Sequence, residues 1–302
     1  MNLYYIKLFL FISICSFSQT RRDSIIKDSI LLPINNRLLD NKNIYLKTYS
    51  ILKKLDINNG YEKELHCKIL EYSYLHNDSN NFKNDLTILV KEYGFKVDFL
   101  KGNESYYEAI INDNLSDWFK EMYLKNHMIW VSNNFKRLKD IRKLNEINLK
   151  DQAISKVASE LITMKFNAND SIKIYTAINK INLENINDII EISKNNNLYA
   201  GSKKFPLIQN GINNAIIHNL RDNTKLTWDA LFPFIKKAYI KNEIDNVIFQ
   251  NYDFYCFINN GYQEFNSYKI DQIPPQFKKG KKEIPLKNVS EFEAIKKEFN
   301  WY

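Results

Sequence analysis

The chain has 302 residues, of which 44% are hydrophobic and 26% charged, and its formal net charge is +8. This composition is that of a protein with a packed core, so it excludes a chain that is disordered throughout. The positive charge does not indicate a nucleic-acid partner, because the N-terminal residues predict export to a compartment without nucleic acid.

The first eighteen residues predict a secretory signal peptide that is cleaved after Ser18. Lys7 is their only charge, and an apolar run extends from residue 8 to Cys15. The run is shorter than the roughly 20 apolar residues that cross a bilayer, so a retained anchor is the lesser alternative. Lipid attachment at Cys15 is a third alternative, although the preceding residues lack the pattern of a lipoprotein signal. The mature chain is expected in the periplasm or at the cell surface, with no later spanning segment.

Residues 19–40 are polar and mixed, and they predict a spacer between the signal and the fold. A domain of helical hairpins is expected over residues 41–145. Apolar side chains recur at helical spacing along 61–72 and again along 82–93, where Gly94 favours a helix end. Because the link between the two segments has about five residues, they are predicted to form an antiparallel αα-hairpin.

The next helical pattern covers residues 107–122 and is broken at 112–114, with Ser116 as the expected cap of the second helix. Charges of both signs then fill residues 136–143, which indicates a solvated helix or a linker. A domain boundary is therefore expected near residue 145.

Residues 146–302 are expected to form a second helical domain. Helices are predicted at 149–165, 206–218, 228–239 and 289–299, and a further helix is predicted to begin at Asn182, which would cap it. Pro233 lies in the first two turns of the predicted helix 228–239, where proline is tolerated. One segment predicts β-structure instead, because aromatic side chains flank Asn259-Asn260-Gly261, a sequence typical of a hairpin turn. The predicted fold is therefore mainly α, with helical hairpins followed by a helical domain that contains one small β-hairpin at 253–268.

Several features of residues 61–123 occur together in the sequence. They are a helix pair, a corner at Gly94-Phe95, an extended stretch at 97–100, and the acidic stretch 112–115 before Trp118. This combination resembles the end of a tetratricopeptide-type helical array. The usual small-residue positions of that repeat are not filled by Ala or Gly, so the resemblance does not fix a number of repeats.

Residues 182–302 carry a second set of polar positions. They are His218 in Ile217-His218-Asn219-Leu220, Asp253 in Asp253-Phe254, and the Gly and Gln of Gly261-Tyr262-Gln263. This set resembles an uncharacterised bacterial domain family with a Gln-His-Ala-Asp motif, an Asp-Arg pair, Gly-x-x-Gln and a final Tyr-Gly-Thr-Gln. The final motif is replaced here by Phe265-Asn266-Ser267-Tyr268. The resemblance implies no activity.

His218 and Asp253 are the best candidates for catalytic chemistry, because a His–Asp pair can orient a general base. No nucleophile motif, metalloprotease motif or phosphate-binding loop accompanies them. We therefore expect His218, Asp253 and Gln263 to lie near one another and to hold the C-terminal domain together. A hydrolase-like enzyme that uses these residues is the alternative.

Cys67 and Cys256 remain after signal cleavage, and two interpretations are open. A disulfide between them is allowed in an oxidising compartment, while two buried thiols are the preferred interpretation. The four histidines are isolated, and His66 points in a different direction from Cys67 on a helix, so neither a metal site nor a cofactor is expected.

The preferred function is that of an exported, non-enzymatic scaffold that binds another protein through its helical hairpins. An immunity protein that neutralises a toxin in the periplasm is a further alternative. The basic cluster at 278–282 is interpreted as a solvated loop, with attraction to an anionic surface as its alternative.

Overall fold

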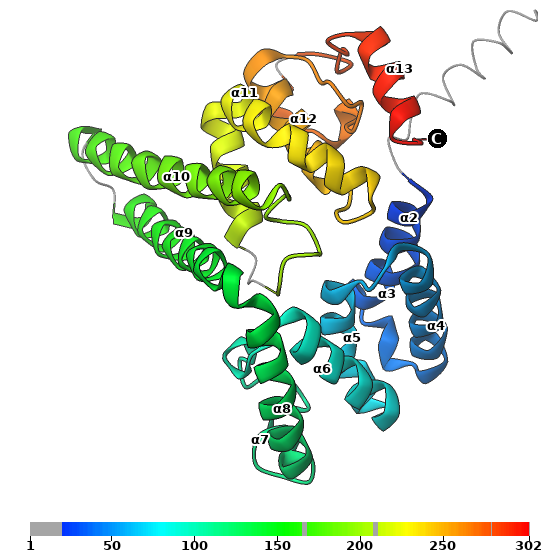
Figure 1. The fold of residues 1–302 in the computed structure, drawn as a ribbon. Helices are drawn as coiled ribbons and strands as arrows, with labels where there is room; N and C mark the ends of the chain where they lie inside the picture. Colours follow the sequence, from blue (N-terminus) through cyan, green and yellow to red (C-terminus); the bar gives the residue numbers. More distant parts are fainter. Residues whose placement is uncertain (1–19, 165–167, 208–210, 279, 302) are drawn as a thin grey trace, which may run out of the picture. The chain divides into compact units, whose positions relative to one another are not determined.

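The computed structural model describes residues 20–164, 168–207, 211–278 and 280–301 (Figure 1). Over these residues every regular element is a helix, which confirms the mainly α class predicted from the sequence. The extended backbone in this part of the chain forms an isolated parallel bridge between Gln263 and Leu286. The predicted signal peptide and its cleavage position after Ser18 lie outside the described residues.

The chain divides into two compact units, and it passes between them more than once. Unit 2 contains Ile25–Glu160 and Ala200–Ile212, and unit 1 contains the segment that ends at Ser24 together with Leu161–Tyr199 and Asn213–Tyr302. The boundary predicted near residue 145 falls inside a long helix, Leu138–Met164.

Unit 2 contains most of the short helices. Its elements are η1 (Ile25–Leu31, a π-helix), α3 (Leu32–Asn35), η2 (Leu38–Asp40), α4 (Lys42–Asn59), α5 (Lys63–Leu75), α6 (Ser79–Tyr93), η3 (Val97–Phe99), α7 (Tyr107–Ile111), α8 (Ser116–Asn134), η4 (Phe135–Arg137) and α9 (Leu138–Met164) as far as residue 160.

Unit 1 contains longer helices. Its elements are α2 (Arg21–Ser24), α10 (Ala168–Asn196), α11 (Gly211–Ile240) from residue 213 onward, α12 (Val247–Asn260), η5 (Ile270–Gln272), η6 (Pro275–Phe277) and α13 (Val289–Glu298).

Residues 21–40 are helical and are not a spacer. Ile26 and Ile30 of η1 and Leu39 of η2 are buried in a core cluster that also contains residues of α4 and α5. The segment contains eight Ile and Leu residues interleaved with charged and polar ones, so its composition alone gave no sign of the three that are buried. Their burial removes enough apolar surface from water to fix the segment against α4.

The predicted hairpin of α5 and α6 is present, and the two helices pack against each other. Asp78 caps α6 by accepting a hydrogen bond from the backbone N–H of Asn81, and Gly94 ends it with φ +67°. The indole of Trp130 lies 2.3 Å from the position that a Cβ of Gly94 would occupy. Gly94 is therefore needed both for its backbone conformation and for the close approach of α8.

The break predicted at 112–114 separates α7 from α8, but Ser116 does not cap α8. Ser116 is the first residue of the helix and is buried, while Leu115 occupies the cap position without a side-chain hydrogen bond. The segment 97–100, expected to be extended, begins with the 3₁₀ turn η3.

In unit 1 the predicted helices at 182 and 206–239 have the wrong boundaries. Asn182 lies inside α10 and is buried, and α11 is one helix that contains Pro233. Ile186, Ile189 and Ile192 of α10 are buried. The packing of long helices thus overrides local signals that favour a helix start.

The predicted β-hairpin at 253–268 is wrong, because residues 247–260 form the helix α12. Gly261, expected in a hairpin turn, has φ +81° and ends this helix. The buried residues of α12 repeat at helical spacing from its first turn onward, and they are Ile248, Phe249, Tyr252, Asp253, Cys256 and Phe257. The hairpin prediction considered the segment only from residue 253 onward, so it did not include the three buried residues before that position.

The beginning and the end of the described chain meet inside unit 1. Tyr239 of α11 donates a hydrogen bond to Asp23 Oδ2 at 2.9 Å and accepts one from the indole N–H of Trp301 at 2.7 Å. Arg22 donates to the carbonyl oxygen of Ile244 at 2.9 Å. Residues 22–23 are therefore part of the buried structure of unit 1.

Candidate functional site

The buried carboxylate of Asp253 organises the loop that follows α12. It accepts hydrogen bonds from the backbone N–H groups of Glu264 (2.8 Å), Phe265 (3.1 Å) and Ser267 (3.0 Å), and from the Ser267 hydroxyl (2.6 Å). Burial raises the pKa of Asp253 to about 6, while the hydrogen bonds from Ser267 and the backbone oppose this shift. Both carboxylate oxygens thus hold the loop in place.

Gln263 joins this loop to the segment before α13. Its backbone N–H donates to Pro285, its backbone carbonyl accepts from Lys287, and its side-chain amide donates to the carbonyl oxygens of Tyr268 and Ile284. The structure therefore brings Asp253 and Gln263 together around one loop. His218 lies half-buried on α11 and takes no part in these bonds.

The basic cluster at 278–282 follows η6, and Lys279 in it lies outside the described residues. Lys281 donates a hydrogen bond to the carbonyl oxygen of Gly261 at 2.6 Å, and its ammonium lies 5.5 Å from the ring centroid of Phe257. Lys281 therefore connects the basic cluster to the C-terminal end of α12.

Both cysteines of the described chain are free thiols, Cys67 in unit 2 and Cys256 in unit 1. Cys256 is buried in α12, and Cys67 lies half-buried on α5. Burial raises the pKa of the Cys67 thiol to about 12, which keeps it protonated at neutral pH.

A buried ionic network in unit 2 has no counterpart in the sequence predictions. His66 of α5 has no exposed surface, and its two ring nitrogens each lie 2.8 Å from a carboxylate, Nδ1 from Asp85 and Nε2 from Asp56. Asp85 also accepts hydrogen bonds from Tyr49 at 2.9 Å and from Lys53 at 3.1 Å. Carboxylates accept hydrogen bonds and do not donate them when ionised, so both ring nitrogens carry protons.

The electrostatics agree with this protonation state. Burial by itself lowers the pKa of His66, but the hydrogen bonds to Asp56 and Asp85 outweigh it and hold the pKa above its ordinary value. Burial likewise acts to raise the pKa of Asp85, and the bond with His66 reverses the shift and lowers it. The ring of Tyr61 stacks on His66 with centroids 4.1 Å apart and closes the network on that side. The network ties α4, α5 and α6 together.

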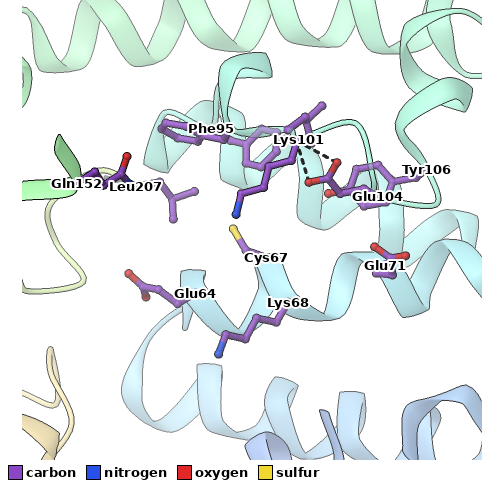
Figure 2. Close-up of a pocket in the computed structure, with 12 residues that line it drawn as sticks. Glu64, Cys67, Lys68, Glu71, Phe95, Lys101, Glu104, Tyr106, Gln152 and Leu207 are labelled. Atoms are coloured by element: carbon purple, nitrogen blue, oxygen red, sulfur yellow. Dashed lines mark hydrogen bonds between the residues drawn. The ribbon is translucent and has the colours of Figure 1, made fainter. Parts of the chain in front are cut away.

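Cys67, the neighbour of His66, points to the other side of α5 and lines a pocket of about 500 Å³ (Figure 2). Three other α5 residues line it at helical spacing, namely Glu64, Lys68 and Glu71. The facing wall comes from the segment 95–106, and further residues are Gln152 and Leu207. The volume falls in the range of roughly 300–1,000 Å³ found for small-molecule sites.

The walls of this pocket are fixed by the fold of unit 2. Lys63, buried at the start of α5, donates hydrogen bonds to the carbonyl oxygens of Phe205 and Pro206, and the backbone N–H of Leu207 donates to Tyr93 at 2.7 Å. These bonds hold the segment 200–207 beside α5. Residues 200–207 belong to unit 2, although they follow α10 of unit 1 in the sequence. Since they are so far from α5 along the chain, no local sequence pattern indicated this pocket.

A second surface of unit 2 is an apolar stripe on α8 and its continuation η4. Leu124, Met128 and Phe135 are between 65% and 73% exposed, and with the half-buried Val131 they repeat at i, i+4, i+7 and i+11. Phe119, Met122 and Trp130 of the same helix are buried in unit 2. The helix is therefore apolar on two faces, and one of these faces is not covered by the described residues of unit 2.

Comparison of the chain with protein families, curated proteins and solved structures gives no match. Among the described residues, no group of three or more His, Cys, Asp or Glu side chains is arranged to hold a metal ion. Within the same residues, no helix combines the length and the apolar character needed to cross a membrane. The candidate sites are therefore defined by their own geometry: the α5 pocket and the α8 apolar stripe.

Proposed function

We propose that this protein is an exported, non-enzymatic binding protein that recognises another protein through the helical hairpins of unit 2. The observation that carries the proposal is the α8 apolar stripe. Three large apolar side chains exposed by more than half on one face of a helix are costly in water, and patches of this kind mark sites of protein association.

The helical organisation of unit 2 supports the proposal. Helices α5, α6 and α8 pack in succession, with α6 in contact with both of its neighbours. In a stack of this kind each hairpin buries one face against its neighbour, and the terminal helix presents a face to a further element. The resemblance to the end of a tetratricopeptide-type array is part of the proposal and is consistent with α8 as that terminal helix.

Asp253, one of the polar residues considered for catalysis, has a structural role. Asp253 accepts hydrogen bonds from three backbone N–H groups and one hydroxyl of a loop, so its oxygens serve the fold. Export is the second part of the proposal, and its support is the composition of residues 1–18.

Site-specific photo-crosslinking in the native cells tests the proposal. A photoreactive residue in place of Met128 should give a covalent adduct with a partner protein, because this position lies in the centre of the stripe. The matched control is Asn133, which is exposed on the opposite side of α8. Equal adducts at both positions, or none at either, would contradict the proposed interface.

The variant pair L124K/M128K and N133K completes the experiment. Charges placed in the stripe should abolish the adduct formed from position 131, while N133K should leave it unchanged. An adduct with twice the mass of the chain would identify the partner as a second copy and would be checked by sedimentation velocity.

A further inference from the structure

The α5 pocket is separate from the α8 apolar stripe, and its chemistry is different. Its apolar lining continues the core of unit 2, because most of its apolar residues pack against that core. The apolar side chains and the aromatic phenol that line it are Cys67, Phe95, Phe99, Leu100, Tyr106 and Leu207. A molecule seated there would remove its apolar surface from water against side chains that are already held in place.

The acidic residues of the pocket are engaged by the protein itself. Glu104 accepts hydrogen bonds from the backbone N–H groups of Lys101 (3.1 Å) and Gly102 (3.0 Å), and Glu71 accepts one from the backbone N–H of Ser105 at 3.1 Å. Glu64 pairs with the buried Lys63 at 3.4 Å. These carboxylates therefore shape the wall at 101–105 and neutralise Lys63.

The basic residues of the pocket are not engaged in this way. Within the described part of the chain, the ammonium groups of Lys68 and Lys101 make no hydrogen bond or ion pair. Figure 2 shows the side chain of Lys101 directed toward Cys67 across the pocket. Lys68 and Lys101 thus offer ammonium groups to a ligand next to the apolar lining, whereas each carboxylate of the lining already has a partner in the protein.

We propose that the α5 pocket binds a small amphiphilic carboxylate, with its apolar chain against the lining and its carboxylate at Lys68 and Lys101. The class is that of a free medium-chain fatty acid. Ammonium groups pair with carboxylates, so the charged end of the ligand lies at these two exposed lysines of the pocket lining, and its chain lies against the apolar lining. No covalent step is involved, because the protonated thiol of Cys67 serves only as part of the lining.

Isothermal titration of the full chain with decanoate, below its micelle concentration, tests the proposal. Decanoate should bind at one site, and decylamine, which has the same chain and the opposite charge, should bind at least about 10-fold more weakly. The double variant K68M/K101M should weaken decanoate binding by about 2- to 10-fold, as expected for the loss of exposed ion pairs. The matched control K54M replaces an exposed lysine of α4 away from the pocket and should have no effect.

Protection of Cys67 against N-ethylmaleimide locates the binding without any variant. Decanoate should slow the modification of Cys67, measured by peptide mass mapping, while the buried Cys256 reports on unfolding. The proposal is overturned if decanoate does not bind, if decylamine binds as tightly, if K68M/K101M binds like K54M, or if bound decanoate leaves Cys67 unprotected. A peptide with an apolar C-terminal residue that binds more tightly than decanoate and protects Cys67 would also overturn it.

Discussion

The buried cation of His66 offers the sharpest test of how unit 2 is held together. Replacing His66 by Ala removes the partner of two carboxylates, Asp56 and Asp85, at the junction of α4, α5 and α6. Removal of one member of a buried ion pair typically costs about 3–5 kcal/mol, because the remaining charge stays buried. Asp85 would keep Lys53 and Tyr49, and Asp56 is partly exposed, so we expect a loss near the lower end, about 3 kcal/mol.

The pH dependence has a definite sign. The pKa of His66 is raised in the folded state, so its contribution to stability is complete below the ordinary pKa of about 6.5 and is lost as the pH rises through the raised value. The pKa of Asp85 is lowered, so its contribution is present above about 3.9 and is lost as the pH falls through the lowered value. The network should therefore stabilise unit 2 most between these limits.

Urea unfolding of the wild type and of H66A at a series of pH values measures both effects. The midpoint of the wild type should fall as the pH rises above neutrality, and this part of the fall should be absent in H66A. At neutral pH the loss of about 3 kcal/mol corresponds to a drop of about 6–12 °C in the melting temperature of a unit of this size. The control is H127A, because burial and Lys96 lower the pKa of His127, so that residue is neutral over the alkaline range. A wild-type midpoint that stays constant from neutral to alkaline pH would refute the reasoning. So would a loss of unfolding free energy in H66A below about 0.5 kcal/mol, which is the size expected for a surface substitution.

Three further predictions concern unit 1 and the N-terminus. D253A should lower stability by about 3 kcal/mol or more, because it leaves three backbone N–H groups of the 264–267 loop without an acceptor, while the exposed D229A should change it little. If D253A unfolds like the wild type and instead loses a hydrolytic activity of the parent protein, the hydrolase-like alternative replaces the structural role. Y239F should destabilise unit 1 by about 1–3 kcal/mol, because the Asp23 carboxylate and the Trp301 indole N–H both lose their hydrogen bond with Tyr239; unchanged thermal unfolding would show that this link contributes nothing. Mass spectrometry of the protein from its native cells should find an N-terminus near Gln19, and an intact Met1 would contradict export.

Local signals in the sequence were enough to find the helices of unit 2 around the α5–α6 hairpin. The spacing of apolar side chains and the ability of Gly94 to adopt a positive φ are properties of short segments, and they hold wherever the segment packs. The same signals failed at α12, where aromatic residues and Asn-Asn-Gly predicted a hairpin. There the burial of one helical face, including Phe249 and Tyr252, outweighs the preference of aromatic residues for strands.

The candidate sites also differ in whether local sequence signals or tertiary packing define them. The sequence by itself determined the helical class of the chain and singled out Asp253 and Gln263, which the structure joins around one loop. Only the tertiary structure decided that His66 lies between two carboxylates and that Cys67 lines a pocket with Leu207. The physical reason is that these contacts join residues far apart in the chain, and the spacing within one helix carries no information about which distant segment will cover its faces.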